Sequence, residues 1–210
     1  MQAPILLASY RHPEIVEPSL YPVWQESFTS GRVFTQPTNA FEALPNDKSL
    51  GVELIGINAD CSMIATKDGT RPKTLWVWQT SSTIPHAVLN FRENVKQILW
   101  HPFLANVLVV VTNQKDPAIY VWHDWTLAPA IGSIPAAAAA KGTYKFEGSW
   151  LPNQVADRHL FMMSSSDAFD IGFVEGKDGD VFFESILWND FLGDEPSELT
   201  NDGQPNSRAI

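Results

Sequence analysis

Two stretches of the chain, Leu75-Trp76-Val77-Trp78 and Ile119-Tyr120-Val121-Trp122, end runs of β-forming residues in a tryptophan. Trp78 and Trp122 are 44 positions apart. A period of about 40–45 residues is typical of repeat architectures in which each unit is a four-stranded sheet. The two stretches therefore indicate a repeat, in which each tryptophan closes the third strand of its unit.

A weaker third copy extends the repeat toward the C-terminus. In all three copies an apolar strand and a turn come before the closing aromatic residue, at distances of 21, 22 and 23 residues. In the second and third copies an aspartate stands six positions before that aromatic, where its short side chain can bond to the turn backbone. The residues that mark the repeat are Trp78, Trp122 and Phe173 at the closing positions, Trp100 and Trp150 at the ends of the preceding strands, and Asp116 and Asp167 in the turns.

This spacing favours an all-β fold made of WD40-type β-propeller blades. About three blades can be counted within 51–174, at about 51–91, 92–134 and 143–186, where the last range includes an additional outer strand. A propeller closes its ring with four to eight blades. We therefore expect an incomplete ring, in a chain that is the C-terminal part of a longer propeller protein or an incomplete gene model of one.

The two ends of the chain differ in composition from the blades. Residues 1–50 contain six prolines and no sustained apolar period, so we expect an extended connector with at most one strand of a preceding blade, around Val33–Thr35. Residues 187–210 are polar and acidic, and we expect a largely disordered tail there.

The charge of the chain excludes one class of partner. The formal net charge is −10, and most of it lies between Glu175 and Asp202, which hold nine acidic residues and one basic residue. Binding to nucleic acid needs clustered Lys and Arg, so no nucleic-acid partner is expected. We expect no membrane partner either, because no run of 18 apolar residues and no basic signal region occurs. One cysteine, Cys61, suits a reducing compartment.

The residue types that carry enzymatic chemistry form no recognisable constellation. The five histidines (His12, His86, His101, His123 and His159) lack metal-ligand spacing, and no glycine-rich phosphate loop is present. We therefore expect a protein that is not an enzyme. No catalytic, cofactor-binding or metal-binding residues, no cofactor and no small-molecule substrate are predicted.

One apolar segment, residues 182–192, lies inside the acidic C-terminal region. As a helix it could dock in a hydrophobic groove of a partner protein. The favoured alternative is that Val181–Ile186 form the outer strand of the third blade, because that blade otherwise lacks one. The candidate partner-binding residues are Phe183, Leu187, Trp188 and Phe191.

Three stretches carry a resemblance to a known family. The most specific is Gly51–Thr80, which contains Ile64–Asp68 and the first tryptophan strand, and Pro85–Trp100 continues it. Arg11–Val16 is similar to the family's His-Pro-containing segment before its mid-chain linker. On these stretches, residues 10–175 resemble the C-terminal half of the WD-repeat protein eight family of centrosomes and fungal spindle pole bodies.

The resemblance implies a non-enzymatic WD40 scaffold at the spindle pole body or microtubule-organising centre, which supports microtubule minus-end anchoring and spindle organisation. The implied partners are a coiled-coil microtubule-anchoring protein and a minus-end-directed kinesin, and the implied location is the cytoplasm and cytoskeleton. Two alternatives stay open: a WD40 adaptor for ubiquitin ligation or trafficking, and, less favoured, a propeller hydrolase. We expect partner specificity in the loop insertions Gly69–Pro72, Asn113–Pro117 and Ala136–Gly142.

The chain departs from typical WD repeats at two points. The closing tryptophans are followed by Gln79 and His123 in place of aspartate, and no Gly-His pair opens any blade. The hydrogen-bonded tetrad of side chains that stiffens typical WD repeats is therefore expected to be absent. Strand packing alone would then hold the blades.

Overall fold

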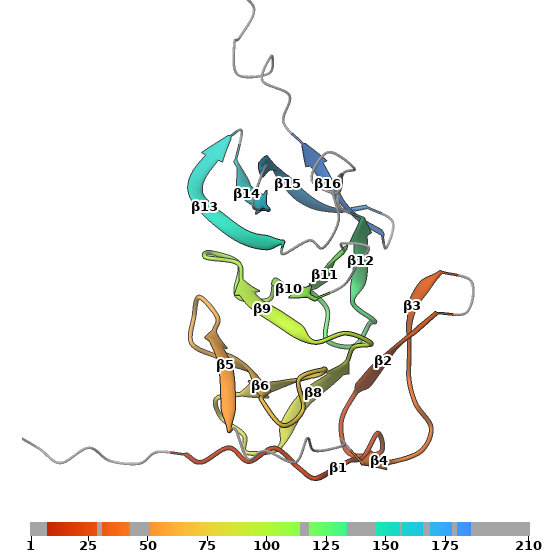
Figure 1. Cartoon of the computed structure of the whole chain (residues 1–210). Coiled ribbons are helices and arrows are strands. Elements are labelled where there is room, and N and C mark those ends of the chain that lie inside the picture. Colours follow the sequence, from red (N-terminus) through yellow and green to blue (C-terminus); the bar gives the residue numbers. More distant parts are fainter. Residues whose placement is uncertain are drawn as a thin grey trace, which may run out of the picture.

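Three four-stranded antiparallel units lie side by side in the computed structural model of the chain (Figure 1). The regular structure is entirely β, and no stretch of the described chain forms a helix that could cross a membrane. The structure describes residues 8–28, 31–42, 51–113, 118–133, 146–155, 157–165, 169–177 and 180–185.

Blade one is a meander in which each strand pairs with the next. Its third strand is buried on both faces, which accounts for the continuous apolar run around Trp76 and Trp78. Its first strand is an edge strand and exposes alternate residues. The strands are β5 (Val52–Ile57), β6 (Met63–Asp68), β7 (Thr74–Gln79) and β8 (Pro85–Asn90).

Blades two and three repeat the same meander. The outer strand of blade three, β16, pairs with β15 from Lys177↔Asp180 to Gly172↔Ser185. Blade two consists of β9 (Val95–Trp100), β10 (Leu108–Thr112), β11 (Ala118–Trp122) and β12 (Ala130–Ser133). Blade three consists of β13 (Glu147–Val155), β14 (Arg158–Ser164), β15 (Phe169–Lys177) and β16 (Asp180–Ser185).

The N-terminal segment contains more structure than the sequence predicts. A hairpin of β2 and β3 adds to the outer edge of blade one, where β2 runs parallel to β8 and makes a six-stranded sheet. The sequence gives no strand signal here, because the buried residues of β2, Val23 and Glu26, are three positions apart and do not follow the period-two alternation of a strand. The strands are β1 (Ile15–Val16), β2 (Val23–Phe28), β3 (Arg32–Thr35) and β4 (Phe41–Glu42).

A buried carboxylate fixes this hairpin to the blades. Glu26 on β2 is only 6% exposed, and it accepts a hydrogen bond from the Tyr120 hydroxyl of blade two at 2.6 Å. Its second oxygen accepts from the backbone amide of Arg92 at 2.9 Å. Charge-assisted hydrogen bonds of this kind offset the free-energy cost of removing the carboxylate from water. The hairpin is therefore an integral part of the packed blades.

The core consists of three apolar layers between sheets. One layer joins blades one and two, through Leu75 and Val77 on one side and Tyr120 and Trp122 on the other. A second layer joins blades two and three. In the third, the N-terminal segment packs on the outer face of blade one, where Val16 and other residues cover the two tryptophans of β7.

The predicted fold class is confirmed. The described chain is all-β, with WD40-type blades in an open arrangement that does not close into a ring. The N-terminal segment occupies the face of blade one on which a preceding blade would pack in a closed ring.

Candidate binding surface

Four side chains form a hydrogen-bonded chain across blade one. Trp78 Nε1 donates to Thr66 Oγ1 at 2.8 Å, and Thr66 Oγ1 lies 2.8 Å from Nε2 of His12. Nδ1 of His12 lies 3.4 Å from the Asp68 carboxylate. Each of these polar groups has a hydrogen-bond partner when the imidazole of His12 is neutral and carries its proton on Nδ1. This tautomer is assigned from the network itself. The expectation that no such tetrad exists is therefore wrong for blade one, because His12 supplies its histidine from 54 residues upstream of Thr66.

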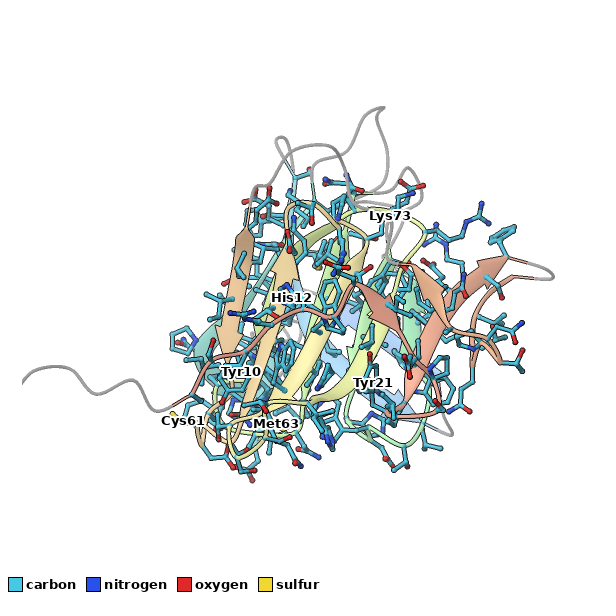
Figure 2. All side chains as sticks on the ribbon, turned by 90° about the horizontal axis from the view of Figure 1, so that it is seen from below. Tyr10, His12, Tyr21, Cys61, Met63 and Lys73 are labelled. Carbon is cyan, nitrogen blue, oxygen red and sulfur yellow. The ribbon has the colours of Figure 1, made fainter. Side chains whose placement is uncertain are left out.

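The segment around His12 is fastened to the outer face of blade one. The imidazole stacks on Trp76 with ring centroids 4.2 Å apart. The Arg71 guanidinium donates to the carbonyl oxygen of Pro13 at 2.7 Å. Figure 2 shows Tyr10 and His12 on an extended segment of the chain that crosses in front of the sheet. The His-Pro stretch and the first tryptophan strand, both part of the resemblance, thus form one structural unit.

The ionisation of the network follows from its burial. Burial lowers the pKa of His12 and outweighs the opposing effect of Asp68, so the imidazole is neutral at pH 7. Burial raises the pKa of Asp68, but hydrogen bonds from Thr70 and His12 outweigh it and lower the pKa overall. Asp68 is therefore an ionised acceptor in the turn between β6 and β7.

The aromatic residues predicted to close the third strands all lie in the core. Trp78 and Trp122 are fully buried, and Trp122 Nε1 donates to the carbonyl oxygen of Leu127 at 2.8 Å. Phe173 lies beneath the Arg158 guanidinium, which stands 3.6 Å from the ring centroid. All three residues support the blades, and the fully buried Trp78 and Trp122 offer no surface to a partner.

The two tryptophans at the ends of the first strands lie between blades. Trp100 of β9 packs on Gly56 of blade one, where an added Cβ would stand 3.0 Å from the indole. Trp150 of β13 donates from Nε1 to the carbonyl oxygen of Leu99 at 3.3 Å. Glycine at position 56 therefore makes room for close packing of the blades. Asp116 and Asp167 lie outside the described residues.

The candidate partner-binding segment of the C-terminal region is only partly described. Phe183 is 7% exposed and packs in the layer between blades two and three. Phe183 therefore belongs to the outer strand of blade three, as the strand interpretation of Val181–Ile186 predicts, and it is not available to a partner. Leu187, Trp188 and Phe191 lie outside the described residues.

Only one of the three loop insertions expected to give specificity is described. In Gly69–Pro72, the amide and hydroxyl of Thr70 bond to Asp68 at 2.8 and 2.9 Å, and Arg71 holds the N-terminal segment. This turn is engaged within the protein. Asn113 is described, but the rest of its insertion and all of Ala136–Gly142 lie outside the described residues.

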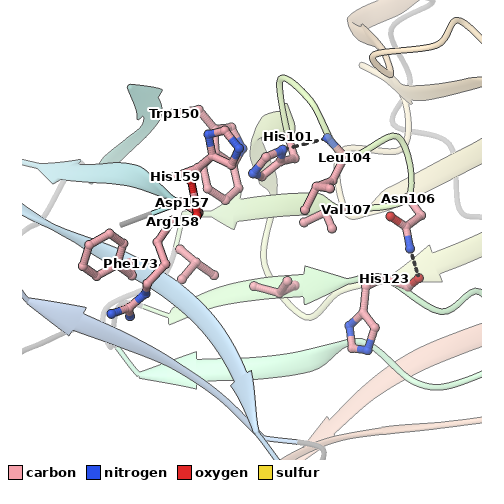
Figure 3. Close-up of a pocket in the computed structure, with 12 residues that line it drawn as sticks. His101, Leu104, Asn106, Val107, His123, Trp150, Asp157, Arg158, His159 and Phe173 are labelled. Atoms are coloured by element: carbon pink, nitrogen blue, oxygen red, sulfur yellow. Dashed lines mark hydrogen bonds between the residues drawn. The ribbon is translucent and has the colours of Figure 1, made fainter. Parts of the chain in front are cut away.

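A hollow of about 440 Å³ opens between blades two and three (Figure 3). Its walls come from the β9–β10 loop, the start of the β11–β12 loop and the β13–β14 hairpin. Asn106 donates to the carbonyl oxygen of His123 at 3.3 Å and joins two of these loops. Apolar lining comes from Leu104, Val107, Val121, Trp150, Phe173 and Val174. Sequence reasoning missed this hollow, because only the fold brings its loops together.

His101 shapes the loop beside this hollow. Its Nδ1 accepts hydrogen bonds from the backbone amides of Phe103 and Leu104 at 3.1 and 2.9 Å. Its ring also packs against the rings of Trp150 and His159, with centroids 4.5 and 4.4 Å away. Burial, aided by repulsion from His159, lowers the pKa of His101 from 6.5 to about 4. The imidazole therefore acts as a neutral acceptor.

This pKa shift predicts a pH-dependent stability. The unfolded chain takes up a proton at His101 below pH 6.5, whereas the folded chain does so only near pH 4. The contribution of neutral His101 to the free energy of unfolding is therefore fully present above pH 6.5, and it falls as the pH drops toward about 4. We expect His101→Asn to reduce this loss by about 1 kcal/mol between pH 7 and 5, since its Oδ1 can accept the same amide bonds without titrating.

The measurement is urea unfolding at the two pH values. His101→Phe lacks both the acceptor and the proton, so it is expected to lose stability already at pH 7. A His101→Asn variant with the pH dependence of the unaltered protein would contradict the assignment.

A second hollow, of about 370 Å³, lies between blades one and two beside the N-terminal segment. Trp125 lines this hollow, with ring contacts to His86 and Trp122 at centroid distances of 6.3 and 4.6 Å. Burial lowers the pKa of His86, so no charged group forms the lining. The other lining residues are Leu20, Tyr21, Pro22, Gln79, Ser82, Ile84, Pro85 and Thr126.

Neither hollow has the composition of a metal centre. Within the described ranges, no group of three or more His, Cys, Asp or Glu side chains could hold a metal ion. What the two hollows offer is apolar surface with a few polar groups, which suits side chains of another protein.

The sequence of the chain is similar to that of a WD repeat-containing protein. An uncharacterised WD repeat-containing protein of Schizosaccharomyces pombe is 22% identical over 185 residues, which cover 82% of this chain and 37% of that protein. A chain in the solved complex of the fission yeast SREBP-SCAP binding domains aligns with 13% identity and a TM-score of 0.46, over 77% of this chain and 44% of that one. No family model matches the chain. The chain thus spans little more than a third of the length of this Schizosaccharomyces pombe protein.

Proposed function

We propose that this chain is part of a non-enzymatic WD40 scaffold that holds other proteins together. The similarity to a WD repeat-containing protein supports this class. The observation that carries the proposal is the pair of apolar hollows at the loop ends of the blades, with exposed Ile84 and Leu104 at their rims. Contiguous apolar surface of this kind is usual where proteins meet other proteins.

We further propose that the scaffold works at the spindle pole body or microtubule-organising centre, in the cytoplasm and cytoskeleton. There it would join a coiled-coil microtubule-anchoring protein to a minus-end-directed kinesin, and so support spindle organisation. The support is the resemblance over Gly51–Thr80 and Arg11–Val16. These stretches contact each other through His12 and Thr66, so the resemblance covers one folded unit.

The test is purification of the tagged gene product from dividing cells, with quantitative mass spectrometry of the proteins that accompany it. We expect enrichment of a coiled-coil protein and a minus-end-directed kinesin, and fluorescence of the tagged protein at both spindle poles. Enrichment of ubiquitin-ligase or trafficking subunits alone, without polar fluorescence, would overturn the spindle-pole proposal. It would leave the scaffold class standing.

A further inference from the structure

In a blade, the loop from the first strand to the second and the loop from the third strand to the fourth lie at the same end. Because neighbouring strands within a blade are antiparallel, the β5–β6 and β7–β8 loops share an end, as do their counterparts in blade two. Asn58 donates to the carbonyl oxygen of Ala105 at 2.8 Å, which places the first connections of both blades together. Figure 2 shows this end with Cys61 and Met63, opposite Lys73. This lower loop face comprises residues 17–22, 58–62, 80–84, 101–107, 123–129 and 157–158.

The lower loop face exposes large apolar side chains. Five of them are at least half exposed, and both hollows open among them. The hollows are neighbours, since His123 lines the first, and Trp125 and Thr126, in the same loop, line the second. A partner segment lying across this loop would reach both. The exposed side chains are Leu20, Ile84, Phe103, Leu104 and Leu127.

The charge at this face is negative. Its one described Lys or Arg side chain, Arg158, is ion-paired with Glu184. Arg71, Lys73 and Arg92 lie instead in loops at the opposite end. The carboxylates of the lower loop face are Glu17, Asp60, Asp124 and Asp157.

We propose that the lower loop face binds a basic amphipathic segment of a partner protein. This inference rests on the proposed scaffold function. Apolar side chains of the segment enter the two hollows, on either side of the loop that holds Trp125. Its Lys and Arg side chains face the surrounding carboxylates, in particular Asp124 and Asp157. Apolar anchors supply affinity and the charges supply orientation and specificity.

The same charges argue against other occupants. Anionic lipid headgroups and nucleic-acid phosphates would be repelled by the four carboxylates of this face. A second copy of the chain would bring a C-terminal region with nine acidic residues and one basic residue between Glu175 and Asp202. A basic segment of another protein is therefore the best match in charge.

The experiment measures binding of the folded chain to a fluorescent Leu–Lys amphipathic peptide of about 18 residues, long enough to form a helix. A Leu–Glu peptide of the same pattern is the charge control. Ile84→Ser and Leu104→Ser remove exposed side chains at the two hollows. Ile55→Ser is the matched control, because Ile55 on β5 is 67% exposed and Ile84 is 60% exposed.

We expect the basic peptide to bind and the acidic peptide not to bind. The double variant Ile84→Ser/Leu104→Ser should weaken binding about tenfold or more, and Ile55→Ser should leave it unchanged. Asp124→Asn with Asp157→Asn should weaken binding and flatten its salt dependence.

Equal binding of both peptides, or equal loss in the Ile55→Ser control, would overturn the proposed surface. The spindle-pole proposal is judged separately by purification of the gene product. If the same partners accompany the Ile84→Ser/Leu104→Ser variant, the scaffold stands and this surface falls. If the basic peptide binds as expected and no spindle-pole protein is enriched, the surface stands and the spindle-pole role falls.

Discussion

Thr66→Val is expected to lower the free energy of unfolding by about 2–5 kcal/mol. The hydroxyl of Thr66 is the central link between Trp78 and His12, at 2.8 Å from each. Valine has nearly the same shape but leaves both nitrogen atoms without their partner in the interior. Each such loss costs about 1–3 kcal/mol, a large fraction of the 5–15 kcal/mol that holds an ordinary domain folded. Denaturant unfolding, followed by tryptophan fluorescence, measures the change.

The chain offers a matched control for this substitution. Thr112 on β10 is also 6% exposed, but among the described residues its hydroxyl has no hydrogen-bond partner. Thr112→Val should therefore be neutral or stabilising, because valine removes an unsatisfied polar atom from a strand that suits it. Equal destabilisation by the two substitutions would show that packing, and not the His12 network, accounts for the effect at Thr66.

The contrast between these threonines shows what the sequence could predict. The spacing of Trp78 and Trp122 was sufficient for the fold class, because strand periodicity and turn chemistry are local properties. The tetrad of blade one was not predictable in the same way. Its histidine lies 54 residues from Thr66 and is separated from β5 by a hairpin that joins the sheet. A search for a histidine next to each blade could not find it.

The candidate binding surface was likewise not predictable from the sequence. Loop insertions are visible in a sequence, so specificity was expected in Gly69–Pro72 and its counterparts. Five large apolar side chains that are at least half exposed instead lie in the lower loop face, at the end opposite Lys73. Among them, Leu20 of the N-terminal segment and Ile84 of blade one line the same hollow. Neither residue stands out in its own stretch of sequence. Only the packing of the N-terminal segment against the blades makes them neighbours.

Gly172→Ala is the other substitution expected to have a large effect, about 3 kcal/mol or more. Gly172 lies on β15 opposite Ser185 of β16. A Cβ there would overlap the backbone carbonyl oxygen of Glu184 and would stand 2.8 Å from the ring of Phe183. Backbone cannot give way without moving the strand, so β16 must shift away from β15. Hydrogen exchange of the β16 amides and the denaturant midpoint report this shift together.

Gly148→Ala is the control, since it adds the same methyl group within the same blade. Its nearest neighbours would be side-chain atoms, of Phe161 at 2.7 Å and Leu99 at 2.9 Å, which can adjust at smaller cost. We therefore expect it to destabilise the chain less and to leave the β16 amides protected. Unchanged protection of β16 in Gly172→Ala would mean that β16 does not pack on β15 in this register. Phe183 would then lose its place between blades two and three and become available to a partner.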